Sequence, residues 1–144
     1  MAYASTLEAP TTIKPKEGMF LEFAPIGRNY EDSLSYKEYK ALQDNLELFP
    51  SNTAHVLEYW LDVSMFSGWD RDKWSKVPWD RNNFKRDIDM YRSLGISSYT
   101  IFATWMLHQF YLDTSGEDEA IKILKEYGTI LKGENVNQET YLQQ

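Results

Sequence analysis

The stretch HVLEYWLDVSMFSGW, residues 55–69, decides how this chain is interpreted. It is one of the most apolar windows of the sequence, yet it holds two acids, Glu58 and Asp62. As a strand, it places Val56, Glu58, Trp60 and Asp62 on one face, because side chains alternate across a strand. As a helix, it leaves the acids on a narrow polar stripe. Its aromatic and β-branched residues favour the strand, and we expect the acid-bearing face to line a wet cavity.

Strand and helix patterns alternate along the rest of the chain. Short apolar runs predict three strands, over 19–26, 55–63 and 96–104. Apolar residues at steps of three and four predict three helices, over 33–49, 80–94 and 115–132. Such alternation predicts parallel strand pairing through right-handed crossovers.

Local signals mark the helix ends. Ser35 and Glu38 have the spacing of a capping box. Asp80 and Ser115 stand where an N-cap is expected, and Gly95 stands where a left-handed residue ends a helix.

Three segments carry no such pattern. Residues 1–18 are typical of an extended connector, residues 64–79 form a long tryptophan-rich loop, and residues 133–144 are a polar tail. We therefore predict one α/β domain over 1–132, made of three parallel βα units. A closed (β/α)8 barrel takes roughly 250 residues, so these units correspond to part of a barrel.

Composition and net charge limit the classes of partner that we expect the chain to bind. The chain has 144 residues, a net charge of −7 and no cysteine. An acidic surface argues against nucleic acid, because phosphate binding needs a basic face. The sequence shows no signal-peptide core and no stretch long and apolar enough to predict a membrane span. It also shows no phosphate loop, nucleotide fingerprint or metal-ligand spacing, so no cofactor and no metal is expected.

Four long motifs carry a resemblance to a known family. They are KPKEGMFLEFAPIGRNY (14–30), NTAHVLEYWLDVSMFSGW (52–69), VPWDRNNFKRDIDMYRSLGISSYTIFAT (77–104) and KEYGTIL (125–131). Over residues 3–132 the chain resembles the C-terminal part of a domain of unknown function from glycan-utilisation proteins of gut bacteria. Those proteins are similar to barrel glycosidases such as α-glucuronidases and hexosaminidases. The resemblance implies the last strands of a (β/α)8 barrel, a carbohydrate partner and an exported parent protein, and it supplies no catalytic residues.

Three acids are candidate catalytic groups: Asp62, Glu22 and Glu58. Glycosidases need two carboxyl groups roughly 5–9.5 Å apart. Positions four apart in a strand are separated by about 13 Å, so Glu58 and Asp62 cannot form that pair together. Glu22, on a neighbouring strand, is the expected partner, and Asp62 is the strongest single candidate. The alternative for each acid is a structural carboxylate paired with Arg28, a lysine or a backbone amide.

Aromatic, arginine and histidine side chains near the predicted strand ends suit sugar binding, because sugar rings stack on aromatic planes. These candidates are Trp60, Trp69, Trp74, Arg28, Tyr30, Trp105 and His108. The alternatives are that the loop tryptophans pack inside and that Arg28 forms a surface ion pair with Glu31 or Asp32. His55 is expected to be a cap or packing residue.

The resulting hypothesis is a glycoside-hydrolase-like segment of a larger barrel protein. Its complete site would need the missing half, supplied by a homodimer or by the remainder of a longer polypeptide. The alternatives are a non-catalytic glycan-binding module and an interaction fragment without a site of its own. In a half barrel, the face that bears Trp60 would be exposed to solvent.

Overall fold

The computed structural model of the chain describes residues 1–29, 32, 34–62, 64, 67–70, 73, 79–103, 112–113 and 116–133. Its strands are β1 (Ala2–Tyr3), β2 (Glu22–Ala24), β3 (His55–Glu58) and β4 (Ser98–Ile101). Its α-helices are α1 (Tyr36–Leu46), α2 (Arg81–Ser93) and α4 (Glu117–Leu131). Two 3-10 turns, Ala4–Thr6 and Ser51–Thr53, complete the described elements.

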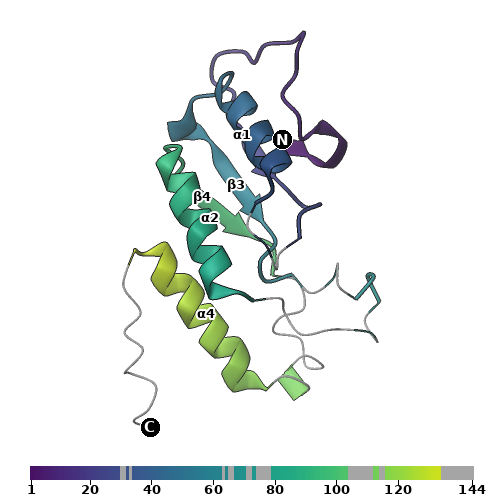
Figure 1. The fold of residues 1–144 in the computed structure, drawn as a ribbon, viewed down its shortest axis with the longest axis vertical. Coiled ribbons are helices and arrows are strands. Elements are labelled where there is room, and N and C mark those ends of the chain that lie inside the picture. Colours follow the sequence, from purple (N-terminus) through teal and green to yellow (C-terminus); the bar gives the residue numbers. More distant parts are fainter. Residues whose placement is uncertain are drawn as a thin grey trace.

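The four strands form one parallel sheet in the order β1-β2-β3-β4 (Figure 1). This confirms the α/β class with parallel pairing. The connector predicted over residues 1–18 is wrong at its start, because Ala2 and Tyr3 pair with Phe23 and Ala24 as an edge strand. A two-residue strand is too short to show an alternating pattern, and only its register with β2 defines it.

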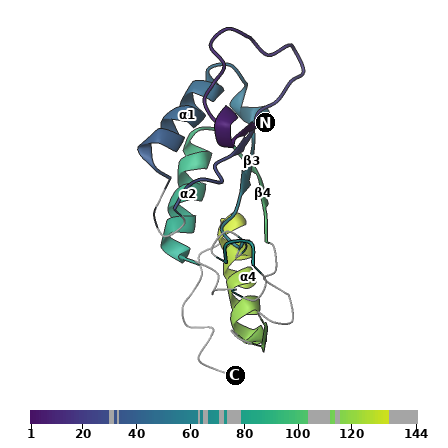
Figure 2. The same cartoon turned by 90° about the vertical axis from the view of Figure 1, so that its right-hand side faces the viewer.

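Helices α1 and α2 connect successive strands and lie on the same side of β3 and β4 (Figure 2). Sequential strand order with right-handed crossovers produces this one-sided arrangement. Helix α4 follows β4 and packs against α2 (Figure 1). The ring of Tyr127 on α4 stacks on that of Phe84 on α2, with centroids 5.2 Å apart. None of these helices is both long and apolar enough to cross a bilayer, within the described part of the chain.

The core lies between the sheet and these helices. Phe23 and Val56 face each other in register on β2 and β3, and both are fully buried. Leu42 of α1 and Phe84 and Ile88 of α2 are buried in the same cluster. Burying each such side chain stabilises the fold by about 1.5–3 kcal/mol, so truncating Phe84 would be among the most damaging single changes.

The predicted caps of α1 and α2 are confirmed. The Ser35 side chain accepts from the backbone N–H of Glu38, and the Glu38 carboxylate accepts from the N–H of Ser35. Asp80 accepts from the first turn of α2. Gly95 has φ 83°, and the N–H of the next residue donates to the Tyr91 carbonyl over 3.0 Å, as a left-handed helix end requires.

The predicted start of the last helix differs by one residue. Its N-cap is Gly116, with φ 87°, and the predicted Ser115 lies outside the described residues. The acids of the first turn, Glu117, Asp118 and Glu119, lie as predicted, where the helix dipole stabilises negative charge.

Candidate functional site

The two faces of the sheet differ in what they present. On β3, Val56 and Glu58 point toward the helices and are buried, whereas His55 and Leu57 are half-buried on the opposite side. We call these the helix-covered face and the open face. The open face also carries Ser98 and Thr100, both exposed on β4.

A cluster of charged and polar groups lies inside the helix-covered face. Arg28 Nη1 is 2.9 Å from Glu58 Oε1 and 2.7 Å from Asp87 Oδ2. Tyr91 donates its hydroxyl to the same Glu58 Oε1. All four side chains are buried. We call Arg28, Glu58, Asp87 and Tyr91 the buried charge cluster.

Three segments distant in sequence build this cluster. Arg28 lies in the turn after β2, Glu58 is the last residue of β3, and Asp87 and Tyr91 are one helical turn apart on α2. Trp60, just after β3, donates its indole N–H to Asp87 Oδ2 over 3.0 Å. The cluster therefore ties the end of the sheet to α2.

Two described residues between β2 and α1, Asp32 and Leu34, contact the same cluster. Arg28 Nη2 donates to the Asp32 carbonyl oxygen over 2.8 Å, and the Leu34 N–H donates to Asp87 Oδ1 over 3.3 Å. These contacts tie the backbone of Asp32 and of Leu34 to the buried groups.

The cluster has two carboxyl groups and a single guanidinium, and this imbalance governs its titration. Burial raises the pKa of Glu58 to about 7, although Arg28 and the Tyr91 hydrogen bond pull it down. Burial alone would lower the pKa of Arg28, but attraction to Glu58 and Asp87 outweighs burial and raises it. The two shifts are compatible, because a charged Arg28 is shared by two carboxyl groups and burial then dominates at Glu58.

These contacts correct two expectations. Glu58 does not line a wet cavity: its side chain is fully buried, and the alternative of a carboxylate paired with Arg28 describes it. Arg28 is not a surface residue, because it is 5% exposed and pairs with Glu58 and Asp87. Its Nη2 also donates to the backbone carbonyl of Asp32.

Asp62 is also buried, in a turn that follows β3. It accepts from the Ser64 N–H over 2.9 Å and from the Ser64 hydroxyl over 2.6 Å. The Ser67 hydroxyl donates to the Ser64 carbonyl over 2.9 Å. The hydrogen bonds that Asp62 accepts therefore stabilise this turn. The expectation that Asp62 faces a wet cavity is wrong.

That turn presents Trp69 to solvent. Trp69 is 63% exposed and has φ 66°, directly after Gly68 with φ 63°. Its N–H donates to the Ser64 carbonyl over 2.9 Å. A left-handed conformation is costly for a bulky residue and is kept where the surroundings enforce it, often at functional sites. The buried Asp62 and Ser64 provide that enforcement here.

Of the described tryptophans of the predicted loop, Trp69 fits the sugar-binding interpretation and Trp79 fits the alternative of interior packing. Trp69 is exposed, as substrate binding requires, whereas Trp79 packs on Phe84 at 5.0 Å and donates to Glu126 over 2.9 Å. The expected exposure of Trp60 is wrong: it is 3% exposed and meets Phe84 edge-on at 4.7 Å. A sugar ring has no access to it.

The open face carries a row of polar groups in register. Glu22 pairs with His55, and His55 pairs with Ser98, across β2, β3 and β4. The imidazole of His55 hydrogen-bonds with Ser98 over 2.7 Å and with Thr100 over 2.8 Å. The expected capping or packing role of His55 is thus replaced by a cross-strand hydrogen-bond network. Glu22 is the one candidate acid that is not fully buried.

Aromatic side chains continue this face toward the strand ends. Tyr59 packs on Phe102 with ring centroids 5.8 Å apart, and Phe102 is 46% exposed. Burial raises the pKa of Tyr59 to about 12, and the neighbouring Tyr3 and Asp62 add to the shift. Its hydroxyl therefore stays neutral and can donate a hydrogen bond at ordinary pH.

The remaining candidates, Tyr30, Trp74, Trp105 and His108, lie outside the described residues. Among the described residues, no group of three histidines, cysteines or acids is placed to hold a metal ion.

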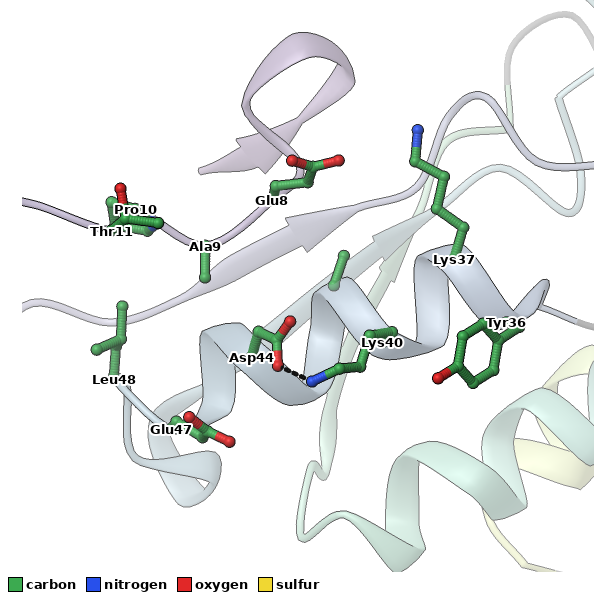
Figure 3. Close-up of a pocket in the computed structure, with 11 residues that line it drawn as sticks. Glu8, Ala9, Pro10, Thr11, Tyr36, Lys37, Lys40, Asp44, Glu47 and Leu48 are labelled. Carbon is green, nitrogen blue, oxygen red and sulfur yellow. Dashed lines mark hydrogen bonds and ion pairs between the residues drawn. The ribbon is translucent and has the colours of Figure 1, made fainter.

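Pockets occur elsewhere, near the N-terminal segment. One of about 540 Å³ lies between residues 8–11 and α1, with Tyr36, Lys37 and the ion-paired Lys40 and Asp44 along its helical wall (Figure 3). A second, of about 420 Å³, lies between the same segment and Phe20 and Phe49. Neither pocket contains a candidate catalytic or substrate-binding residue. Ligands of parallel sheets sit at the carboxyl ends of the strands, so we assign the candidate site to that end.

Asp87 and Tyr91 are the cluster members that the sequence interpretation did not assign. Asp87 is three residues after Phe84 and four before Tyr91, so it shares the apolar face of α2. An acid on a buried helix face requires a partner, and that pattern was a usable signal. No family model, curated protein or solved structure matches the chain in the comparisons made with it.

Proposed function

We propose that this chain is a glycoside-hydrolase-like, carbohydrate-active segment of the (β/α)-barrel type. The observation that carries the proposal is the one-sided winding: four parallel strands in sequential order, with α1 and α2 on the same face. A doubly wound sheet instead places helices on both faces. In a barrel, the uncovered face becomes the interior, and here that face bears Glu22, His55 and the hydroxyls of β4.

Carbohydrate is the partner that the exposed groups suit. Trp69 offers a free aromatic plane at the carboxyl end of the sheet, on which the C–H face of a sugar can stack. Phe102 adds a second exposed ring on the open face. The resemblance to glycan-utilisation proteins supports the same class of ligand.

If the protein is an enzyme, Glu22 is the candidate acid best supported by accessibility. Glu58 and Asp62 are fully buried and already accept hydrogen bonds. A glycosidase needs a second carboxyl group roughly 5–9.5 Å away. We propose that this partner comes from another part of a longer polypeptide or from a second copy of the chain.

A non-catalytic glycan-binding module is the second candidate, and the burial of Glu58 and Asp62 favours it. In that case Trp69 stacks on the sugar and no carboxyl group acts as acid or base. The two candidates differ in whether bound glycan is cleaved.

The test is calorimetric titration with a panel of neutral and uronic-acid-containing oligosaccharides. We expect Trp69→Ala to weaken binding by about tenfold, because a stacked ring is removed. The control is Tyr36→Ala, which removes another exposed aromatic side chain, on α1. No binding by the unmodified chain, or equal binding by Trp69→Ala, would contradict the proposal.

Product analysis on the same samples separates the candidates. Cleavage that is lost in Glu22→Gln supports the hydrolase. If the chain binds glycan but does not cleave it, either as a monomer or as a dimer, the result supports the glycan-binding module.

A further inference from the structure

We propose that His55 and Ser98 on the open face form an acyl-transfer site, where the Ser98 hydroxyl attacks a carboxylic ester and the His55 imidazole accepts its proton. This activity is independent of the proposed function, which assigns no chemical step to either residue. His55 and Ser98 are the first residues of β3 and β4, on the side of the sheet that α1 and α2 leave uncovered (Figure 2).

A nucleophile and its base must lie within hydrogen-bond reach, and this pair does. His55 Nδ1 is 2.7 Å from the hydroxyl oxygen of Ser98, inside the roughly 2.6–3.2 Å that proton abstraction requires. Ser98 is exposed, so an ester can reach its hydroxyl from solvent. The parallel register of β3 and β4 holds the two residues directly opposite each other. Two paired strands therefore position the reacting groups, which gives a more precise geometry than a loop would.

Thr100 orients the imidazole from its other nitrogen. The Thr100 hydroxyl oxygen is 2.8 Å from His55 Nε2. A neutral imidazole has one N–H donor and one acceptor. In the reactive tautomer Nδ1 accepts from Ser98 and Nε2–H donates to Thr100, so Thr100 is a positioning residue. Ser98 is the nucleophile rather than Thr100, because a primary hydroxyl is less hindered than a secondary one.

Glu22 places an acidic side chain beside the imidazole. It is half-buried and lies opposite His55 in the register of β2 and β3, whose backbones are about 4.8 Å apart in such a sheet. A carboxylate at this position stabilises the imidazolium that forms when Ser98 loses its proton. The open face thus supplies a nucleophile, a base, a group that orients the base and a counter-charge.

The reaction has two balanced steps. In the first, Ser98 Oγ bonds to the carbonyl carbon while His55 takes the hydroxyl proton, and the alkoxide leaves with that proton as an alcohol. In the second, water adds to the acyl carbon and gives a proton through His55 to Ser98 Oγ, which leaves as the free hydroxyl and releases the carboxylic acid. An ester suits the pair better than an amide, because an alkoxide leaves more readily than an amine.

The side chains beyond the pair suit a short acyl group. Leu57 follows His55 on the open face and is half-buried opposite Thr100. Phe102, further along the same face, is 46% exposed. These apolar groups can contact the methyl or methylene groups of the acyl chain. The substrate class is therefore an ester of a short carboxylic acid such as acetate.

The first measurement uses the full chain and p-nitrophenyl acetate. Release of p-nitrophenolate is followed at about pH 8, where an imidazole is ordinarily neutral, and tandem mass spectrometry then locates the acetyl group. We expect acetyl-Ser98 to accumulate. Ser93 is the internal comparison, because its exposed hydroxyl donates to the Met90 carbonyl over 2.7 Å rather than to an imidazole. A label map without Ser98, or with equal labelling of Ser93 and Ser98, would overturn the proposal.

The second measurement removes each reacting group in turn. His55→Gln should slow the acetylation of Ser98 by about 100-fold, because the general base is lost. Ser98→Ala should abolish this label, and the matched control Ser93→Ala should leave it unchanged. Unchanged acetylation of Ser98 in His55→Gln would overturn the proposal. If that variant did not fold, the comparison of Ser93 with Ser98 in the unmodified chain would still decide the matter.

The role of Thr100 has its own test. Thr100→Val removes the hydroxyl that orients the imidazole and should slow the acetylation of Ser98 by roughly tenfold. Thr100→Ser keeps a hydroxyl at the same position and should restore most of the rate. An unchanged rate in Thr100→Val, or an equal loss in both variants, would contradict the positioning role.

Discussion

Each face of β3 carries one polar side chain, His55 on one and Glu58 on the other, and the surroundings of these two side chains differ. Glu58 faces α2, where it is fully buried and shares Arg28 with Asp87. His55 faces away from the helices and bonds to hydroxyls that are exposed to solvent. A buried ion pair is costly to break, whereas an exposed polar contact is worth little. The same strand thus carries a buried structural network on its helix-covered face and solvent-accessible polar groups on its open face.

The largest loss of stability should come from removing Arg28, the cation of the helix-covered face. Arg28→Met leaves Glu58 and Asp87 without their shared partner, and we expect a loss of about 3–5 kcal/mol in the free energy of unfolding. Urea denaturation near neutral pH measures it. Lys85→Met is the matched control, because Lys85 pairs with Asp89 in solvent, and it should change stability little.

The second largest effect should be the change in stability with pH that the ionisation of Glu58 causes. The pKa of Glu58 rises from 4.5 in the unfolded chain to about 7 in the folded one, mainly through burial. Because the folded pKa is the higher, its contribution is complete below about pH 4.5 and is lost as the pH rises to 7 and above. We expect a loss of about 3 kcal/mol relative to Glu58→Gln over this range. Parallel stability curves for the two proteins would argue against a buried proton.

On the open face, His55→Ala should cost about 1 kcal/mol or less. The variant removes two hydrogen bonds to Ser98 and Thr100, but water can replace them at an exposed site. Thermal denaturation measures this effect. A cost as large as that of Arg28→Met would mean that the open face is covered and structural, and the contrast between the faces would fail.

The smallest expected change in stability is a gain rather than a loss. Trp69→Gly relieves a left-handed backbone at φ 66°, and we expect stability to stay level or to rise by up to about 1 kcal/mol. The same variant should lose glycan binding. A marked loss of stability would show that the Trp69 side chain is needed for packing rather than kept exposed for a ligand.

The sequence predicted what depends on neighbours along the chain. The capping box of Ser35 and Glu38, the Asp80 cap and the Gly95 end are local, so residue types and spacing suffice to find them. Strand alternation also correctly grouped Val56 and Glu58 on one face. It did not determine which face the helices cover, because that choice is made by crossover connections and not by β3 itself.

The polar networks were predicted only in part, because they join distant residues: the Arg28–Glu58 pair was an alternative, and Asp87, Tyr91 and the His55 contacts were not assigned. Arg28 and Glu58 are 30 positions apart, and His55 and Ser98 are 43 apart. The local sequence does not identify the partner of either residue: the parallel register brings His55 to Ser98, and the turn after β2 brings Arg28 to Glu58. Glu58 and Asp62 therefore looked like site residues, although their acids are used to build the fold.

The central claim is that ligands reach the open face and the Trp69 turn, while the buried charge cluster stays structural. The most direct measurement is an amide and side-chain NMR map of the chain, recorded during titration with the oligosaccharide panel. We predict shifts at Trp69, Glu22, His55 and Phe102, with Arg28 and Tyr91 unmoved. Shifts centred on the buried charge cluster, or the absence of shifts throughout the panel, would contradict the account.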